Sequence, residues 1–177
     1  QGFKHLAFCE LGFRHFTTNK REITCAADMK GQSIRVQEAP IWFALTDCLG
    51  ATATPVAFNE LYTALSQGMV DGQENPIPYI ASSKFYEVQD YLCDAQSNLY
   101  MTCTCVNPTF FASLPEDIQQ IVLETIDEMY PRSFEIQKEL NDAALDKILD
   151  AKPDINVEEL TDDERAAYAE LAQNAYA

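Results

Sequence analysis

The chain has 177 residues, of which 47% are hydrophobic and 11% aromatic. This length suits one ordinary domain with a real core, and the composition excludes a disordered or low-complexity protein. Twelve Lys and Arg against 28 Asp and Glu leave a formal net charge of −16, so the overall field repels nucleic acids and anionic lipid surfaces.

The first 110 residues alternate short β-like and helical runs, a pattern typical of an α/β domain with a largely parallel sheet. No apolar run approaches the roughly 20 residues that a membrane-spanning helix needs. We expect strands at residues 5–9, 33–37 and 54–57, around 91–93, and at 99–106.

Helices are expected between these strands. Residues 41–49 have an apolar face and stop at Gly50, a residue suited to the position just past a helix. Asn59 is expected to cap a second helix at residues 60–67.

A long amphipathic stretch begins at Leu114 and predicts one long helix or two joined ones. Because Pro131 lacks a backbone donor and clashes with the preceding turn, we expect a kink or break just before it. Thr161, followed three residues later by Glu164, predicts a capping box that opens a final helix.

Six cysteines stand without a Cys-x-x-Cys pair or a histidine spaced for zinc, so no metal site is expected. We expect two of them, Cys103 and Cys105, to face opposite sides of a strand and to be poorly placed to pair. A disulfide framework or redox pair is one interpretation, and small buried apolar residues is the favoured one. The six are Cys9, Cys25, Cys48, Cys93, Cys103 and Cys105.

Arg35 is a lone cation in an otherwise apolar strand, close to the end where open α/β sheets bind ligands. A guanidinium can hold a carboxylate through two parallel hydrogen bonds, so Arg35 is a candidate anion-binding residue. A structural ion pair with one of the 28 acidic residues is the alternative, and composition alone does not separate the two.

Four sequence blocks together resemble the solute-binding proteins of the tripartite ATP-independent periplasmic (TRAP) transporters. The most characteristic block is Pro55 to Pro76, PVAFNELYTALSQGMVDGQENP. The others are residues 28–36, 84–92 and 114–120, and the four follow the family's order with near-family spacing.

This resemblance implies a periplasmic-binding-protein-like α/β fold with a long helix and a C-terminal helix. It implies a periplasmic protein, its signal peptide removed, that captures an organic acid such as a dicarboxylate for the sodium-coupled membrane permease subunits, with no enzymatic activity, cofactor or metal. Residues 1–93 would form the ligand-binding lobe and 94–177 the interlobe strands and helices. The N-terminal lobe of the family is expected to be largely absent.

The resemblance also assigns ligand-binding roles. Arg35 matches the family's carboxylate-clamping arginine, Arg14 a second arginine, Asn75 an amide that bonds the same carboxylate, and Phe58 an aromatic that packs on the ligand. Purely structural roles remain open as alternatives: Arg14 could lie on the surface, Asn75 could start a turn and Phe58 could belong to the core. Glu38 could contact a ligand hydroxyl or amine, or cap the helix after it.

Capture of a carboxylate for TRAP transport is therefore the expected function. The first alternative is a sensory ligand-binding module of the same fold. The second is an enzyme with a cysteine nucleophile near His5 or His15. These residues leave open which organic acid is bound.

Overall fold

The computed structural model describes residues 2–176, which form two compact units that interleave along the chain. Unit 1 comprises the segment up to Gly12 together with Leu99–Ala143, and unit 2 comprises Phe13–Asn98 and the segment from Ala144 on. This division differs from the expected boundary near residue 93, because β1 (Lys4–Thr18) and α5 (Glu116–Ala151) each contribute residues to both units.

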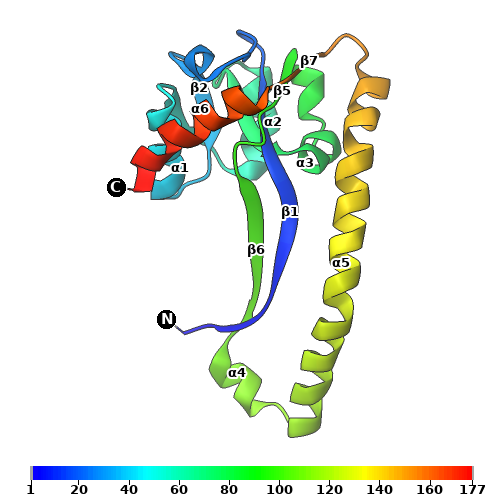
Figure 1. Cartoon of the computed structure of the whole chain (residues 1–177). Coiled ribbons are helices and arrows are strands. Elements are labelled where there is room, and N and C mark those ends of the chain that lie inside the picture. Colours follow the sequence, from blue (N-terminus) through cyan, green and yellow to red (C-terminus); the bar gives the residue numbers. More distant parts are fainter. Residues whose placement is uncertain (1, 177) are drawn as a thin grey trace. The chain divides into compact units, whose positions relative to one another are not determined.

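The sheet of unit 2 has the strand order β3-β2-β4-β1-β5-β7, and β6 pairs with β1 outside this path (Figure 1). β1 is antiparallel to β4 and β5, whereas β2 is parallel to β3 and β4, and β5 is parallel to β7. In this strand order, all strands except β1 therefore run in the same direction, which confirms the expected largely parallel sheet. Their bounds are β2 (Ser33–Val36), β3 (Thr52–Pro55), β4 (Gly72–Pro76), β5 (Tyr91–Asp94) and β7 (Asn156–Glu159).

Strand register determines which side chains share a face of this sheet. Phe16 lies opposite Glu74 and Cys93, so these three side chains belong to one face, called here the first face. Neighbours along each strand point the other way. The second face therefore carries Thr17, Arg35, Gln73, Asn75 and Leu92.

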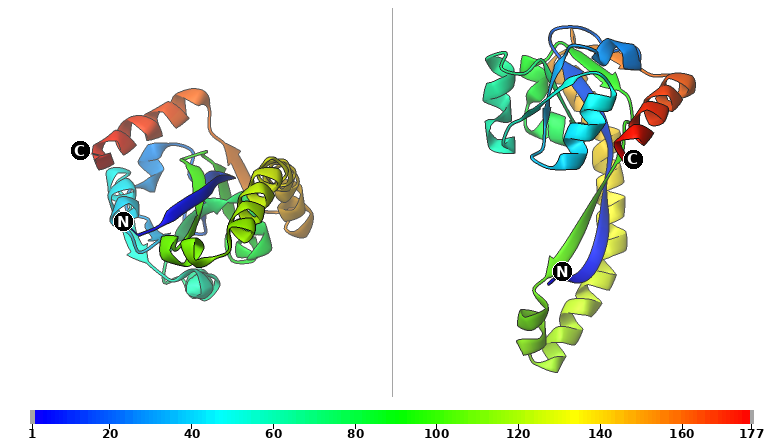
Figure 2. Two further views of the ribbon diagram at one scale, coloured as in Figure 1. Left: turned by 90° about the horizontal axis from the view of Figure 1, so that it is seen from below. Right: turned by 90° about the vertical axis from the view of Figure 1, so that its left-hand side faces the viewer.

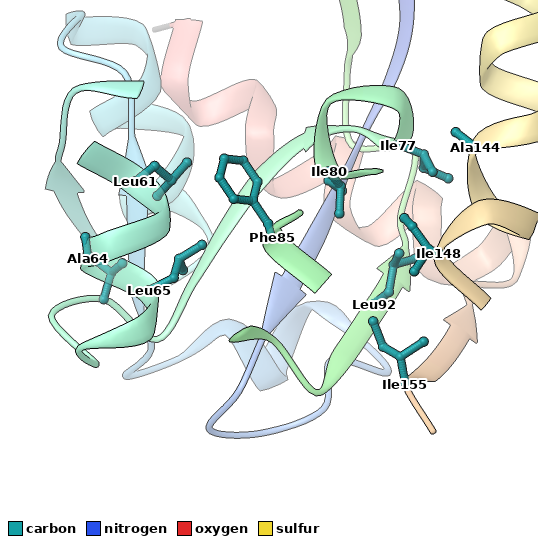
Figure 3. Close-up of a cluster of buried hydrophobic side chains, with 11 residues drawn as sticks. Leu61, Ala64, Leu65, Ile77, Ile80, Phe85, Leu92, Ala144, Ile148 and Ile155 are labelled. Atoms are coloured by element: carbon teal, nitrogen blue, oxygen red, sulfur yellow. The ribbon is translucent and has the colours of Figure 1, made fainter. Parts of the chain in front are cut away.

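Each face is covered by its own hydrophobic core. On the first face, Phe16 and Ile34 pack with Tyr168 of α6 (Asp162–Ala172). The core on the second face is drawn in Figure 3 and includes α2 (Leu61–Ser66), α3 (Ile77–Ser82) and the end of α5, with Leu61, Leu65, Ile80, Phe85, Leu92 and Ile148. In Figure 2, α1 (Pro40–Cys48) and α6 lie on one side of the strands, and α2 and α3 on the other.

Local signals in the sequence account for the ends of α1 but not for the start of α2. Pro40 occupies the first turn of α1, and Gly50 has a φ of 73°, as expected just past a helix. The cap predicted at Asn59 is wrong. Asn59 lies inside a short 3-10 helix at Phe58–Glu60, and α2 begins at Leu61 without a side-chain cap.

The C-terminal helices form largely as expected. α5 runs through Pro131 without interruption, so the alternative of one long helix is confirmed and a break is wrong. A single interior proline removes one hydrogen bond, and a helix of 36 residues retains its bonds on either side. The capping box is confirmed: the Thr161 amide donates to Glu164 Oε2 at 2.8 Å, and the Glu164 amide donates to Thr161 Oγ1 at 3.3 Å.

The strands differ from expectation at several points. β1 extends over 15 residues, far beyond the predicted 5–9, because its two halves belong to different units. β3 begins two residues earlier than expected. β4 and β7 were not expected, since both are rich in polar residues and lack the apolar alternation of a half-buried strand.

Unit 1 consists of the first part of β1, β6 (Leu99–Val106), α4 (Pro108–Ser113) and α5 up to Ala143. Asn107 caps α4 by accepting a hydrogen bond from the Phe110 amide at 3.0 Å. Gly12 has a φ of 94°, and a Cβ at this position would collide with the side chain of Asn141. The positive φ and the lack of space for a Cβ both require glycine at position 12.

The cysteines depart from the sequence prediction. Cys103 and Cys105 are exposed, and their Sγ atoms lie 3.2 Å apart. The prediction that they face opposite sides of the strand is wrong, because residues two apart in a strand point to the same face. All six cysteines are free, and burial in the core is confirmed only for Cys93, since Cys9, Cys25 and Cys48 are half-buried.

Candidate functional site

The candidate site is built around β4, a central strand whose five residues are all buried. Three of them are polar: Gln73, Glu74 and Asn75 are 0%, 8% and 4% exposed. Buried polar groups cost free energy unless they are hydrogen-bonded, so a strand of this kind needs partners on both faces. β1 and the turn before β6 supply them.

Arg14 is held on the first face by several partners at once. Its side chain is 1% exposed, and Nε donates to Glu74 Oε1 at 3.0 Å while Nη2 donates to the Glu74 carbonyl. The guanidinium also lies over the Trp42 ring, 4.8 Å from the ring centre. Such contacts fix the plane of the guanidinium, which favours bidentate recognition of a carboxylate.

Glu74 is itself oriented from the other side. Its Oε2 accepts hydrogen bonds from Ser97 Oγ at 3.2 Å and from Asn98 Nδ2 at 3.3 Å. The carboxylate thus links β1, β4 and the turn before β6. The sequence alone gives no sign that Ser97, Asn98 and Trp42 lie beside Glu74 and Arg14, because these contacts join distant parts of the chain.

Arg35 and Asn75 lie on the second face. Arg35 is 3% exposed, its Nε donates to the Val56 carbonyl at 2.8 Å, and its guanidinium lies 5.9 Å from the centre of the Phe58 ring. Since Asn75 is a buried strand residue, the alternative of a turn-starting asparagine is wrong.

A chain of amide and hydroxyl groups orients Asn75. Its Nδ2 donates to Gln73 Oε1, Gln73 Nε2 donates to Thr17 Oγ1 at 2.9 Å, and Thr17 donates to Gln89 Oε1 at 3.0 Å. An amide NH₂ carries two hydrogens, so this bond leaves Asn75 one further donor for another group.

Register places these side chains near the same end of the sheet but on both of its faces. Arg14 lies opposite Pro76, the last residue of β4, and Arg35 lies opposite Gln73 near the end of β2. This is the carboxyl end of the parallel strands, where open α/β sheets bind ligands. Arg35 and Asn75 share the second face, whereas Arg14 belongs to the first.

The two remaining predicted residues are more exposed. Phe58 is 44% exposed, and its ring makes edge contacts with Tyr79 and Phe85 at 6.4 and 5.8 Å, so it forms the rim of the second-face core. Glu38 is exposed between β2 and α1. The residue that caps α1 is Ala39, which makes no side-chain cap bond, so the capping role considered for Glu38 is wrong.

A small cavity adjoins the buried ion pair on the first face. Its volume is about 30 Å³, and its lining includes Trp42, Glu74 and Asn98. A space of this size holds water.

Both histidines have other partners than cysteine. His15 Nδ1 lies 2.8 Å from Asp94 Oδ1, and the His5 ring packs on Phe8 at 4.3 Å. Burial alone would raise the pKa of Asp94, but His15, together with the charge of Arg165 and a hydrogen bond with Gln96, outweighs it and holds that pKa below its usual value. These contacts give the alternative of a cysteine-dependent enzyme no support.

The described part of the chain contains neither a metal-binding cluster nor a membrane-spanning helix. Among residues 2–176, no group of three or more histidine, cysteine or acidic side chains is arranged to hold a metal ion. None of the helices in this range is long and apolar enough to cross a bilayer.

Comparison with known proteins gives one consistent result. The family model of bacterial extracellular solute-binding proteins, family 7 (DctP), matches residues 1–177. The ectoine/5-hydroxyectoine-binding periplasmic protein UehA of Ruegeria pomeroyi is 34% identical over 155 residues, which cover 88% of this chain and 46% of that protein.

Solved structures agree with this match. A TRAP periplasmic solute-binding protein from Desulfovibrio salexigens with bound orotic acid has a TM-score of 0.89 and 39% identity, covering 97% of this chain and 54% of that one. The periplasmic ectoine-binding protein of the TeaABC TRAP transporter from Halomonas elongata has a TM-score of 0.93 and 32% identity, covering 98% and 56%. This chain thus spans about half the length of the relatives it matches.

Proposed function

Because this chain belongs to family 7 of the bacterial extracellular solute-binding proteins, we propose that it captures a small organic acid for a TRAP transporter without changing it chemically. The working compartment is the periplasm, and the partners are the sodium-coupled permease subunits in the membrane. The names of its relatives support this proposal, since UehA is a periplasmic binding protein and the Desulfovibrio salexigens protein holds orotic acid.

One observation carries the proposal: two buried arginines and an asparagine amide lie near the carboxyl end of the sheet in a strongly acidic chain. Arg35 would clamp the carboxylate, and Asn75 would complete its hydrogen bonds from the same face. Arg14, oriented by Glu74 and Trp42, would reach the carboxylate over the end of the strands. Phe58 would pack on the ligand beside Arg35, and Glu38 would contact a hydroxyl or amine on it.

The test is a thermal-shift screen of the chain against carboxylates, including orotate, ectoine, a four-carbon dicarboxylate and a sugar acid. A ligand that binds only the folded state raises apparent stability by RT ln(1 + [L]/Kd). We expect one chemical group of acids to raise the melting temperature.

Two variants of Arg35 test whether this residue binds the ligand carboxylate. Arg35→Ala should weaken binding by about 100-fold or more, because a charged hydrogen bond is lost in a buried site. Arg35→Lys should recover only part of the affinity, since lysine keeps the charge but not the bidentate geometry. Arg132→Ala, at an exposed position on α5, is the matched control and should bind like the wild type. Unchanged affinity in both Arg35 variants would remove Arg35 from the site.

A further inference from the structure

Cys103 and Cys105 are two exposed thiols on one face of β6, with their Sγ atoms 3.2 Å apart. Among the cysteines of residues 2–176, this is the one Sγ pair within hydrogen-bonding distance. Both belong to unit 1, whereas Arg14, Arg35 and Asn75 belong to unit 2.

The two sulfurs lie close together, but a bond between them needs a local change in the strand. Residues two apart in a strand have Cα atoms roughly 6.6 Å apart, from a rise of about 3.3 Å per residue. Disulfides span Cα separations of about 4.4 to 6.8 Å, so the pair lies at the long end of the allowed range. A disulfide also needs Cβ atoms about 3.5 to 4.5 Å apart, closer than two residues on one face of an extended strand, so the bond requires β6 to bend locally. A bond under such strain is readily reduced.

We propose that Cys103 and Cys105 form a modification site: a dithiol that closes to an intrastrand disulfide by exchange with an oxidised disulfide, and that reopens on reduction. The oxidant is a small-molecule disulfide such as oxidised glutathione, or the disulfide of a periplasmic oxidoreductase. Exposure of both thiols gives such a reagent access.

The exchange proceeds in two balanced steps. The thiolate of one cysteine attacks a sulfur of the reagent, forms a mixed disulfide and releases one reagent thiolate. The second protein thiolate then attacks the protein sulfur of the mixed disulfide and releases the other half of the reagent. Two protein thiols lose two protons and two electrons, and one reagent disulfide gains them as two thiols.

The reactivity of the pair depends on pH. The hydrogen bond shared with Cys105 raises the pKa of the Cys103 thiol, so its thiolate fraction is small at neutral pH and grows as the pH rises. Exchange should therefore be faster at about pH 9 than at about pH 7.

The experiment treats the reduced 177-residue chain with oxidised glutathione, quenches with acid, and alkylates the remaining thiols before tryptic digestion and mass spectrometry. The peptide at residues 85–132 contains Cys93, Cys103 and Cys105. We expect it to lose two hydrogens and two alkylation sites, with fragment ions that place the bond between Cys103 and Cys105. Cys93 should stay reduced, because burial raises the pKa of its thiol to about 12.

Single substitutions provide the controls. Cys103→Ser and Cys105→Ser should each abolish the two-hydrogen loss and instead accumulate a glutathione adduct on the remaining thiol. Cys48→Ser, at a half-buried position away from the pair in sequence, should behave like the wild type. Two alkylated thiols at these positions after oxidation, a bond to Cys93, or a disulfide between two chains would overturn the proposal.

Discussion

Glu74 is the residue on which the order of the candidate site depends. It pairs with Arg14 through one oxygen and accepts from Ser97 and Asn98 through the other. Removing one partner of a buried ion pair leaves the other charge uncompensated. The free energy lost in this way exceeds the free energy that the intact pair contributes to stability. The Glu74 carboxylate therefore stabilises the fold chiefly by compensating the buried charge of Arg14.

Glu74→Gln should lower the free energy of unfolding by about 3 kcal/mol, because it neutralises the partner of a buried guanidinium while keeping the side-chain shape. Denaturant unfolding at neutral pH measures this loss. Glu60→Gln is the control at an exposed position and should change stability by less than about 0.5 kcal/mol. Equal stability of the two variants would mean that the Arg14–Glu74 pair contributes nothing.

Asp94 makes the free energy of unfolding depend on pH in acidic solution. His15 lowers its pKa in the folded chain below the usual value near 3.8, so the unfolded chain takes up the proton first as the pH falls. The stabilisation is fully present above about pH 5 and is lost as the pH falls through the folded pKa. Asp94→Asn lacks this contribution at every pH.

The wild type should therefore be more stable than Asp94→Asn at pH 6 by about 1 kcal/mol, and the difference should shrink toward pH 3. Urea unfolding of both proteins across this range gives the difference curve. A difference that stays constant with pH would show that the His15 contact does not favour the charged carboxylate.

At the scale of elements, β4 lies so close to β1 that its first residue has no room for a side chain. A Cβ on Gly72 would collide with the Thr17 carbonyl and come within 2.7 Å of Thr18 Cγ2. The φ of Gly72 is not positive, so space and not backbone conformation requires glycine.

Gly72→Ala should therefore destabilise unit 2 by about 2–3 kcal/mol, because the neighbouring atom is backbone and cannot move aside cheaply. Gly31→Ala is the comparison: its Cβ meets nothing within 4 Å, so its cost comes from the positive φ alone and should be about 1 kcal/mol. Thermal unfolding ranks the two, and a smaller loss for Gly72→Ala would contradict the close approach.

How much the sequence predicts also differs from element to element. β6 and α6 were predicted because their signals are local: an unbroken β-like run and a capping box. β4 was not, because Gln73, Glu74 and Asn75 look like a turn until their partners on strands about 60 residues away are known. In the site, Arg35 could be predicted as a lone cation in a strand, but the Arg14–Glu74–Trp42 contacts could not.

At the scale of the whole molecule, neither compact unit is a continuous stretch of sequence. Unit 2 joins Phe13–Asn98 to the residues after Ala144, and its sheet gains its last strand, β7, only from Asn156–Glu159. Almost every strand pairing connects distant parts of the chain, which predicts slow folding dominated by non-local contacts.

This interleaving has a consequence for biosynthesis. While the ribosome is still making α5, one edge of β5 has no partner and Phe16 lacks the cover of Tyr168, because β7 and α6 follow α5 in the chain. An unpaired edge and an uncovered apolar face invite aggregation. Until β7 and α6 have been translated, the nascent chain therefore exposes surfaces of the kind that chaperones bind.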